Sequence, residues 1–224
     1  MTVRKLIVIR HAESLEDVDN DVYGRIPDEQ IPLSPKGEMQ AVSLGLQLKE
    51  EIGEGNSVHF YLSPCKRVMD TADLLISHMR GIRCSRSDEP LIRKQDWGCI
   101  TLENRDQIER ERYEAGVLRY TFRGGESGPE FVARFTLFAK QVKDELNRSS
   151  YPEHVAVITH GFGVRTLLMV LLGWSEEYFE SLAHPDNCGY KRLEIRQDGS
   201  LVLLDPMSQH NLMAQHGFVG RKTS

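Results

Sequence analysis

The chain of 224 residues is long enough to bury one sizeable α/β core, and we expect a single domain over 1–224 rather than two small ones. A hydrophobic content of 40% with 27% charged residues is ordinary for a globular protein that folds in water. The formal net charge of −5 argues against electrostatic binding of nucleic acid, although a local basic pocket can still hold one phosphate group.

The cysteines are scattered along the chain without a Cys-x-x-Cys pair, which favours reduced thiols over a disulfide framework or a zinc site. The first apolar run, over 6–9, is too short for the hydrophobic region of a signal peptide, and no later run approaches ~18 residues. We therefore expect a cytoplasmic protein with no metal and no membrane partner. Nothing in the sequence specifies the oligomeric state, so a homodimer is left open.

The first third of the chain predicts a strand, a loop and a helix. An apolar run over 5–11 indicates a buried strand. The polar, turn-rich segment over 13–32 follows, and a loop of this length is usually functional. Ser34 then suits the N-cap of a helix that begins with Pro35 and carries apolar residues as far as position 48.

A second buried strand is predicted over 58–62. Ser63 suits the N-cap and Pro64 the first position of the next helix, which places Arg67 in or just past its first turn. The helix dipole disfavours a cation there unless an anion compensates it, so Arg67 predicts a negatively charged partner. A surface ion pair with Asp70 is the alternative.

The middle of the chain predicts a short strand around 89–94 and then a cap over about 98–130 that contains one helix near 102–115. Apolar positions from 131 to 146 predict a long helix, which leads to another buried strand over 154–160.

The last third of the chain predicts an apolar helix over 161–172, a further helix capped by Ser175, and a hairpin of strands over 190–195 and 201–204. A polar tail is expected from about 206. The alternation of strands and helices favours a three-layer α/β sandwich, in which helices cover both faces of a mostly parallel central sheet.

Two of the predicted strands stop on a histidine, His11 and His160. The carboxyl ends of parallel strands meet at one edge of a sheet, where open α/β folds bind ligands. Gly161 also allows backbone N–H groups to approach a ligand closely. The sequence therefore predicts an active site that contains both histidines.

These segments carry a resemblance to the histidine phosphatase superfamily, in its phosphoglycerate-mutase-like branch. The match runs in the family's order from residue 3 to about 190, and it implies the phosphoglycerate-mutase-like fold. The segment 93–98 also resembles a subgroup of that branch whose substrates are poorly defined. The motifs that carry the resemblance are Arg10-His11-Ala12-Glu13-Ser14, Leu62-Ser63-Pro64 with Arg67, Gly124-Gly125-Glu126-Ser127 and Thr159-His160-Gly161.

The resemblance implies that His11 attacks phosphorus and forms a phosphohistidine, which water then hydrolyses without a cofactor. Arg10, Arg67 and His160 would form the phosphate pocket, because guanidinium groups fork onto phosphate oxygens with two aligned donors. The expected substrate is a small phosphorylated metabolite.

The proton donor is where this chain departs from the family, because Lys94 stands where the resembled subgroup has an acidic glutamate. Three outcomes are open. Asp96 lies two residues on and would share the side of an extended strand, so it can replace the glutamate as donor. Lys94 can itself donate if the two arginines lower its pKa to about 7 to 8. Otherwise no group replaces the acid, and turnover of poor leaving groups falls by roughly 10² to 10⁴.

Several further residues bear on substrate binding. Asp17 stands where many members of the family carry a donating asparagine, and Ala12 where they commonly carry glycine. Glu126 either contacts the substrate or caps the next helix. The remaining histidines lack ligand-like spacing and are interpreted as structural or solvated. The residues expected to contact the substrate are Asp17, Arg25, Gly161, Phe162 and Glu126.

Three functions remain open at this point. The first is a cofactor-independent phosphohydrolase, weakened by Lys94. The second is a phosphoglycerate mutase, although the segment between 98 and 124 is short and lacks the mutase signature. The third is a phosphate-binding protein without turnover, which the extra cation at position 94 would favour.

Overall fold

The computed structural model describes residues 4–101, 103–146 and 152–209. Its strands form one sheet in the order β3-β2-β4-β1-β5-β6. The parallel strands are β1 (Lys5–Arg10), β2 (Ser57–Leu62), β3 (Arg83–Asp88) and β4 (His154–Thr159). An antiparallel edge is added by β5 (Tyr190–Ile195) and β6 (Leu201–Leu203).

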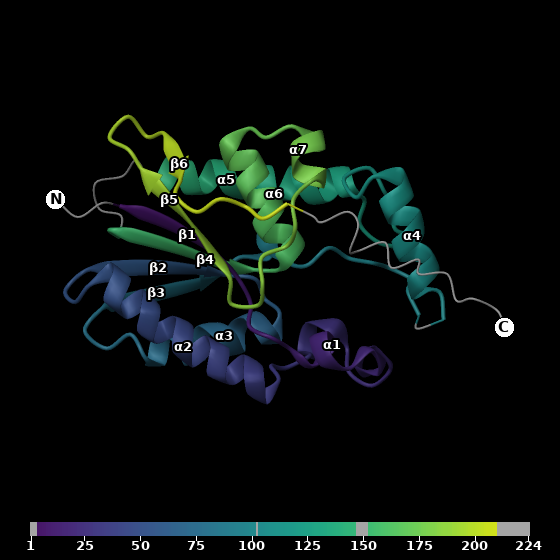
Figure 1. Cartoon of the computed structure of the whole chain (residues 1–224), viewed down its shortest axis with the longest axis horizontal. Coiled ribbons are helices and arrows are strands. Elements are labelled where there is room, and N and C mark those ends of the chain that lie inside the picture. The colour runs from purple at the N-terminus through teal and green to yellow at the C-terminus, as the bar shows by residue number, and fades with distance from the viewer. Residues whose placement is uncertain (1–3, 102, 147–151, 210–224) are drawn as a thin grey trace.

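Helices cover both faces of the sheet (Figure 1). One face packs against α2 (Pro35–Ile52) and α3 (Lys66–Ser77), and the other against α5 (Gly128–Leu146) and α6 (Gly161–Leu172). The buried residues of β1 alternate between two hydrophobic clusters, because successive side chains of a strand point to opposite faces. The predicted three-layer sandwich is confirmed.

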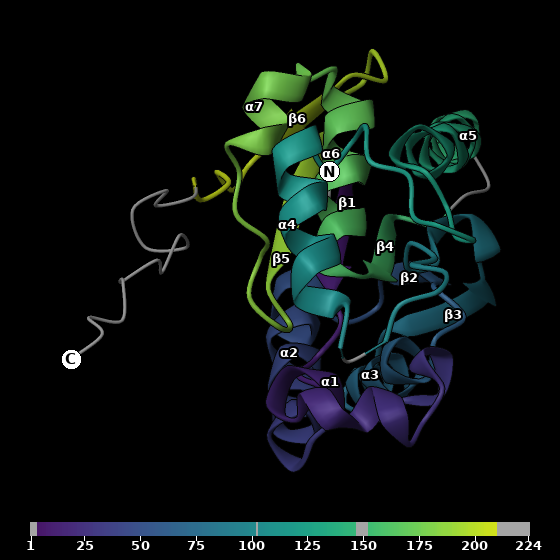
Figure 2. The ribbon, with the colours of Figure 1, turned by 90° about the vertical axis from the view of Figure 1, so that its right-hand side faces the viewer.

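The remaining short elements lie beyond the carboxyl ends of the parallel strands or along the rim. Figures 1 and 2 place the α1 segment (Leu15–Val18) and α4 (Arg105–Ala115) on opposite sides of that end. The others are α7 (Glu176–Glu180) and short 3₁₀ helices at Asn20–Gly24, Asp28–Gln30 and Pro90–Ile92.

The strand predicted around 89–94 is wrong. That stretch contains the 3₁₀ helix Pro90–Ile92, and the strand lies earlier, at Arg83–Asp88. Its side chains are exposed or half-buried throughout, because β3 is the edge strand of the sheet. Edge strands often carry charged residues, so this one lacks the apolar run by which the other strands were identified.

The helix caps were predicted with mixed success. The Ser34 hydroxyl accepts a hydrogen bond from the Gly37 N–H at 3.0 Å, as expected for an N-cap. Ser63 does not cap α3, which begins at Lys66 after Cys65. Arg67 nevertheless lies in the first turn, as predicted.

Other predictions concern the C-terminal part and the segment over 98–130. The hairpin of β5 and β6 is confirmed, and the Ser175 hydroxyl accepts from the Tyr178 N–H at 3.1 Å. The single-domain organisation and the cap over 98–130 stay predictions, and most of the expected polar tail lies outside the described residues. Within the described ranges, none of the helices combines the length and apolarity needed to cross a bilayer.

Candidate active site

The two predicted histidines meet at the carboxyl edge of the sheet. The parallel register pairs Arg10 with Thr159, and the His11 N–H donates to the Thr159 carbonyl at 2.9 Å. His160 follows β4 directly and is the N-cap residue of α6. The ring centroids of His11 and His160 are therefore only 5.1 Å apart, and both residues are buried.

The hydrogen bond of the His11 ring defines its tautomer. Its Nδ1 lies 2.7 Å from the Ala12 carbonyl oxygen, which can only accept, so Nδ1 carries the proton and Nε2 the lone pair. The Nε2 atom of His160 lies 2.9 Å from the Ser63 hydroxyl.

Both imidazoles are held neutral by their surroundings. Burial, and then the Arg67 charge, lower the pKa of His11 to about 3. The same two causes, in the same order, lower the pKa of His160 well below its usual value. A neutral His11 with a lone pair on Nε2 is the form that a nucleophile requires.

These lowered pKa values predict how stability depends on pH. In the unfolded chain His11 binds a proton below pH 6.5, whereas in the folded protein it stays neutral down to about pH 3. Unfolding is therefore favoured as the pH falls from 6.5 toward 3, by up to about 1.4 kcal/mol per pH unit for this group. Urea unfolding measured across this range should show a shallower dependence in His11→Gln. An unchanged slope in the variant would contradict the neutral, buried imidazole.

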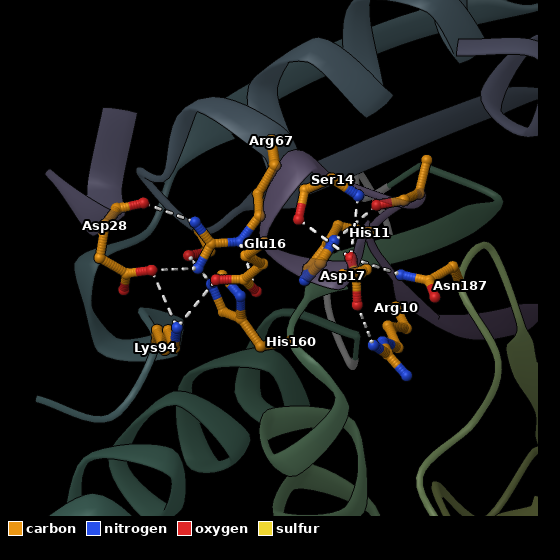
Figure 3. A network of polar contacts seen from close by, with 12 residues as sticks. Arg10, His11, Ser14, Glu16, Asp17, Asp28, Arg67, Lys94, His160 and Asn187 are labelled. Atoms are coloured by element: carbon orange, nitrogen blue, oxygen red, sulfur yellow. Dashed lines mark hydrogen bonds and ion pairs between the residues drawn. The ribbon is translucent and has the colours of Figure 1, made fainter. Parts of the chain in front are cut away.

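Arg67 has the negatively charged partners that its position predicts, and they come from the loop after β1. Its Nη1 and Nη2 donate to the backbone oxygen and the Oδ1 atom of Asp28 at 2.6 and 3.2 Å. Its Nε lies 3.4 Å from Oε1 of Glu16 (Figure 3). The alternative pairing with Asp70 is wrong, because Asp70 accepts from Lys66 at 2.9 Å.

Glu16 separates Arg67 from the pocket. A cavity of about 260 Å³ is lined by Glu16, His11 and His160, whereas Arg67 is fully buried and does not line it. Arg10, His11, Arg67 and His160, the four predicted site residues, therefore lie in the same region. The Arg67 guanidinium, however, is held by a carboxylate of the protein itself. A phosphate that binds the Nε side of this guanidinium would compete with the Glu16 carboxylate.

Arg10 also has a carboxylate partner. Its Nη2 donates to Oδ1 of Asp17 at 3.0 Å, and its Nη1 to the Pro185 carbonyl at 2.9 Å. The second oxygen of Asp17 accepts from the backbone and hydroxyl of Ser14 at 2.8 and 2.9 Å. Asp17 thus lines the cavity as an acceptor that orients Arg10.

Lys94 completes a network of alternating charges. Its Nζ donates to Oε2 of Glu16 at 3.1 Å and to Oδ1 of Asp28 at 2.8 Å, and it lies 3.1 Å from the Tyr23 hydroxyl (Figure 3). Burial alone would lower the pKa of Lys94, but the Glu16 and Asp28 carboxylates outweigh it and raise this pKa. The Arg67 charge does act to lower this pKa, but the two carboxylates outweigh it, so the alternative in which the pKa of Lys94 falls to about 7 to 8 is wrong.

Asp96 is not placed with the histidines. Its Oδ1 accepts from the Gly98 N–H at 2.8 Å, in a turn that Gly98 makes with a φ of 59°. It lines a neighbouring, larger cavity of about 770 Å³ rather than the one that contains His11 and His160. Asp96 therefore does not line the cavity that contains His11, and its role as proton donor stays a prediction.

Of the remaining residues predicted to contact the substrate, two line the cavity and two do not. Gly161 and Phe162 line the cavity with His11. Arg25 is exposed, pairs with Asp19 and does not line it. Glu126 is also outside the lining, since both of its carboxylate oxygens accept from Arg134, at 2.6 and 2.9 Å.

Glu126 is not the helix cap either, which was the other prediction for this residue. The Ser127 hydroxyl accepts from the Glu130 N–H at 3.2 Å at the start of α5, and Oε2 of Glu130 accepts from the Ser127 N–H at 2.8 Å. Glu126 instead neutralises a buried arginine.

Sequence reasoning missed several residues that line the cavity. Glu16 and Tyr23 belong to the loop that its length had marked as functional, so a signal existed for the segment but not for the residues. The spacing of His184 does not relate it to His11 or His160, so the sequence predicts a structural or solvated role for it. The lining residues that the sequence does not predict are Glu16, Tyr23, Gln95, Trp97, Arg105, Arg112, Phe131, Gly163 and His184.

No group of three or more potential metal ligands occurs within the part of the chain that the structure describes. The sequence expectation of a site without metal or cofactor stays a prediction.

The curated relatives of this chain include a protein named as mutase-like and one named as a phosphatase. The chain is 28% identical over 233 residues to the phosphoglycerate mutase-like protein AT74H of Arabidopsis thaliana, an alignment covering 95% of this chain and 82% of that protein. It is 22% identical to the broad-range acid phosphatase DET1 of Saccharomyces cerevisiae, over 86% of this chain and 85% of the relative.

Solved structures share the fold. The native mycobacterial glucosyl-3-phosphoglycerate phosphatase aligns with a TM-score of 0.67 and 18% identity, over 93% of this chain and all of that one. The phosphoglycerate mutase of Bacillus anthracis aligns with a TM-score of 0.69 and 19% identity, over 92% and 93% of the two chains. The family model of the histidine phosphatase superfamily (branch 1) matches residues 6–205, and the chain therefore belongs to that superfamily.

Proposed function

We propose that this protein is a phosphatase that transfers the phosphoryl group of a small phosphorylated molecule to His11 and then to water. The observation that carries the proposal is the pairing of the His11 Nδ1 atom with the Ala12 carbonyl, which leaves the lone pair on Nε2 of a ring that lines the cavity. Arg10 and His160 line the same cavity and supply donors for the phosphate oxygens. We also place the protein in the cytoplasm, on the basis of its scattered cysteines.

The chemistry has two steps. In the first, Nε2 of His11 forms a bond to phosphorus while the bond from phosphorus to the leaving oxygen breaks, and that oxygen takes up a proton. In the second, water attacks phosphorus, loses a proton, and releases phosphate from Nε2. Both steps require the negative charge on the phosphoryl oxygens to be held by cationic or N–H donors.

Proton donation is the weak point of the proposed mechanism. The lowered pKa of Glu16 keeps this carboxylate ionised: burial would raise the pKa, but Lys94 and Arg67 outweigh it. The Tyr23 hydroxyl and the Lys94 ammonium keep their protons at neutral pH, since burial and the Glu16 charge raise the pKa of Tyr23 to about 12. Both are weak acids, so we expect hydrolysis of alkyl phosphates to suffer most, by roughly 10² to 10⁴.

The second candidate is a mutase that returns the phosphoryl group to a bound intermediate instead of to water. The name of the Arabidopsis relative and the fold shared with a mutase support this candidate. The third candidate, a phosphate-binding protein without turnover, is supported by the cation at position 94, which replaces the expected acid.

Turnover of 4-nitrophenyl phosphate tests the proposal. We expect slow hydrolysis with stoichiometric release of phosphate, and His11→Ala should reduce it to the uncatalysed background because the nucleophile is lost. The matched control is His78→Ala, since His78 bonds only to residues of its own helix end and lies in neither cavity. Retained activity in His11→Ala would refute the phosphatase. Interconversion of phosphoglycerates without release of phosphate would favour the mutase.

A further inference from the structure

Arg112 is a further cationic residue of the cavity, beside Arg10, Lys94 and Arg105, and the proposed mechanism does not use it. It lies on α4, which comes from the side of the site opposite the α1 segment (Figure 2). Its exposed fraction is only 7%, yet it lines the same cavity as His11, Arg10 and His160. Arg112 therefore lies beside any ligand that binds in this cavity.

This guanidinium has few polar partners. Its Nη2 donates to Oε1 of Gln95 at 3.2 Å, and its Nε is buried without a hydrogen-bond partner. In the described part of the chain it forms no ion pair with a carboxylate. By contrast, the buried arginines Arg67 and Arg134 each pair with a carboxylate, from Glu16 and Glu126 respectively.

Aromatic rings hold the Arg112 charge without neutralising it. The Cζ atom lies 4.6 Å from the ring centroid of Phe162, 5.5 Å from that of Trp97 and 5.7 Å from that of Phe122. Such rings attract a cation through their faces but accept no strong hydrogen bond from its edge. Apart from the buried Nε–H and the donor that bonds to Gln95, the donors of the guanidinium group therefore remain for a ligand.

A buried charge without a counter-ion is costly for a fold, and a bound anion removes that cost. Burial lowers the pKa of Arg112, although Tyr113, Glu109 and Glu180 act in the opposite direction at longer range. Arg112 differs in this respect from Arg10, whose guanidinium already has the Asp17 carboxylate as its partner.

We propose that Arg112 binds a second anionic group of the substrate, either a carboxylate or a second phosphate, while the phosphoryl group to be transferred lies at His11. This inference rests on the proposed function and narrows its substrate class to phosphate monoesters with two anionic ends. The two ends must lie close together, because the cavity that contains both residues measures only about 260 Å³.

Substrates that share one ring test the proposal: phenyl phosphate, 4-carboxyphenyl phosphate and 1,4-phenylene bisphosphate. Charge-assisted hydrogen bonds to a buried arginine should raise kcat/KM for at least one of the doubly anionic compounds by roughly tenfold over phenyl phosphate. In Arg112→Met, which keeps an unbranched stem among the rings, this ratio should fall toward one. Arg112→Lys should give an intermediate ratio, since it keeps the charge but not the planar fork.

Binding is measured separately, by calorimetry on His11→Ala and on His11→Ala with Arg112→Met, so that the result does not depend on turnover. The subsite is overturned if the unaltered protein shows a ratio near one between kcat/KM for the doubly anionic compounds and kcat/KM for phenyl phosphate. It is also overturned if Arg112→Met leaves this ratio unchanged. Absent hydrolysis together with Arg112-dependent binding of the doubly anionic compounds overturns the phosphatase but retains the subsite. Glu180→Gln is the control for a purely structural charge, and an equal loss of the ratio there would also contradict the proposal.

Discussion

Replacing Lys94 by glutamate should destabilise the fold and lower hydrolysis, even though it restores the residue type that the family has at this position. The new carboxylate would face Glu16 and Asp28, which Lys94 now holds at 3.1 and 2.8 Å. Replacing one partner of a half-buried ion pair by a like charge leaves the two carboxylates uncompensated, so we expect a loss of about 2 kcal/mol in the free energy of unfolding. Urea unfolding measures this loss. Lys140→Glu, on the exposed face of α5, is the control for the same change in net charge.

The paired exchange Lys94→Glu with Glu16→Lys should recover less than half of the lost stability. It restores the opposite charges of positions 16 and 94, but the new lysine then faces Arg67 and the new glutamate faces Asp28. It should also raise the hydrolysis of alkyl phosphates above that of the unaltered protein, since a carboxyl group then stands at the expected acid position. A gain in alkyl phosphate hydrolysis from Lys94→Glu alone would contradict the account, because it would mean that Glu16 and Asp28 do not constrain position 94.

Removing the negative charge of Glu16 should strengthen phosphate binding. Glu16 lines the cavity and contacts Arg67 at 3.4 Å, so it holds the guanidinium that would otherwise meet a phosphate. A unit charge a few ångströms away changes the binding free energy by more than 1 kcal/mol at an effective dielectric constant of about 20, so we expect Glu16→Gln to lower the Kd for inorganic phosphate roughly tenfold. Calorimetric titration measures the Kd.

The matched control is Glu29→Gln. Glu29 is exposed and lines the larger cavity but not the one that contains His11, so the same change of charge is made outside the site. Weaker phosphate binding in Glu16→Gln than in this control would show that Glu16 positions Arg67 for phosphate instead of competing with it.

The sequence was sufficient to predict the groups that lie at strand and helix ends. Buried apolar runs that stop at His11 and His160 indicate parallel strands, and the parallel register of β1 and β4 then brings both rings to one edge. Arg67 could be placed in the first turn of α3 even though Ser63 was the wrong prediction for the cap. The short connection between the end of β2 and the start of α3 allows few positions for the first turn.

The charge network could not be predicted, because it depends on the backbone path of the loop over 13–32. Sequence patterns gave that loop a length and a polar composition, but neither determines that Glu16 and Asp28 turn toward Arg67. Arg112 was missed for a related reason: its partners are rings that are distant in sequence, and α4 carries no apolar face that would indicate how it packs. The edge strand β3 was missed because its exposed side chains are polar.

The most direct test of the account is to identify the atom that carries the phosphoryl group. The protein is quenched in alkali during turnover of an aryl phosphate, and the phosphorylated residue is located by mass spectrometry, with phosphorus NMR to identify the nitrogen. The His11 tautomer predicts an acid-labile phosphohistidine at position 11, bonded through Nε2. A phosphoryl group on Nδ1 of His11, or on any other residue, would contradict the mechanism.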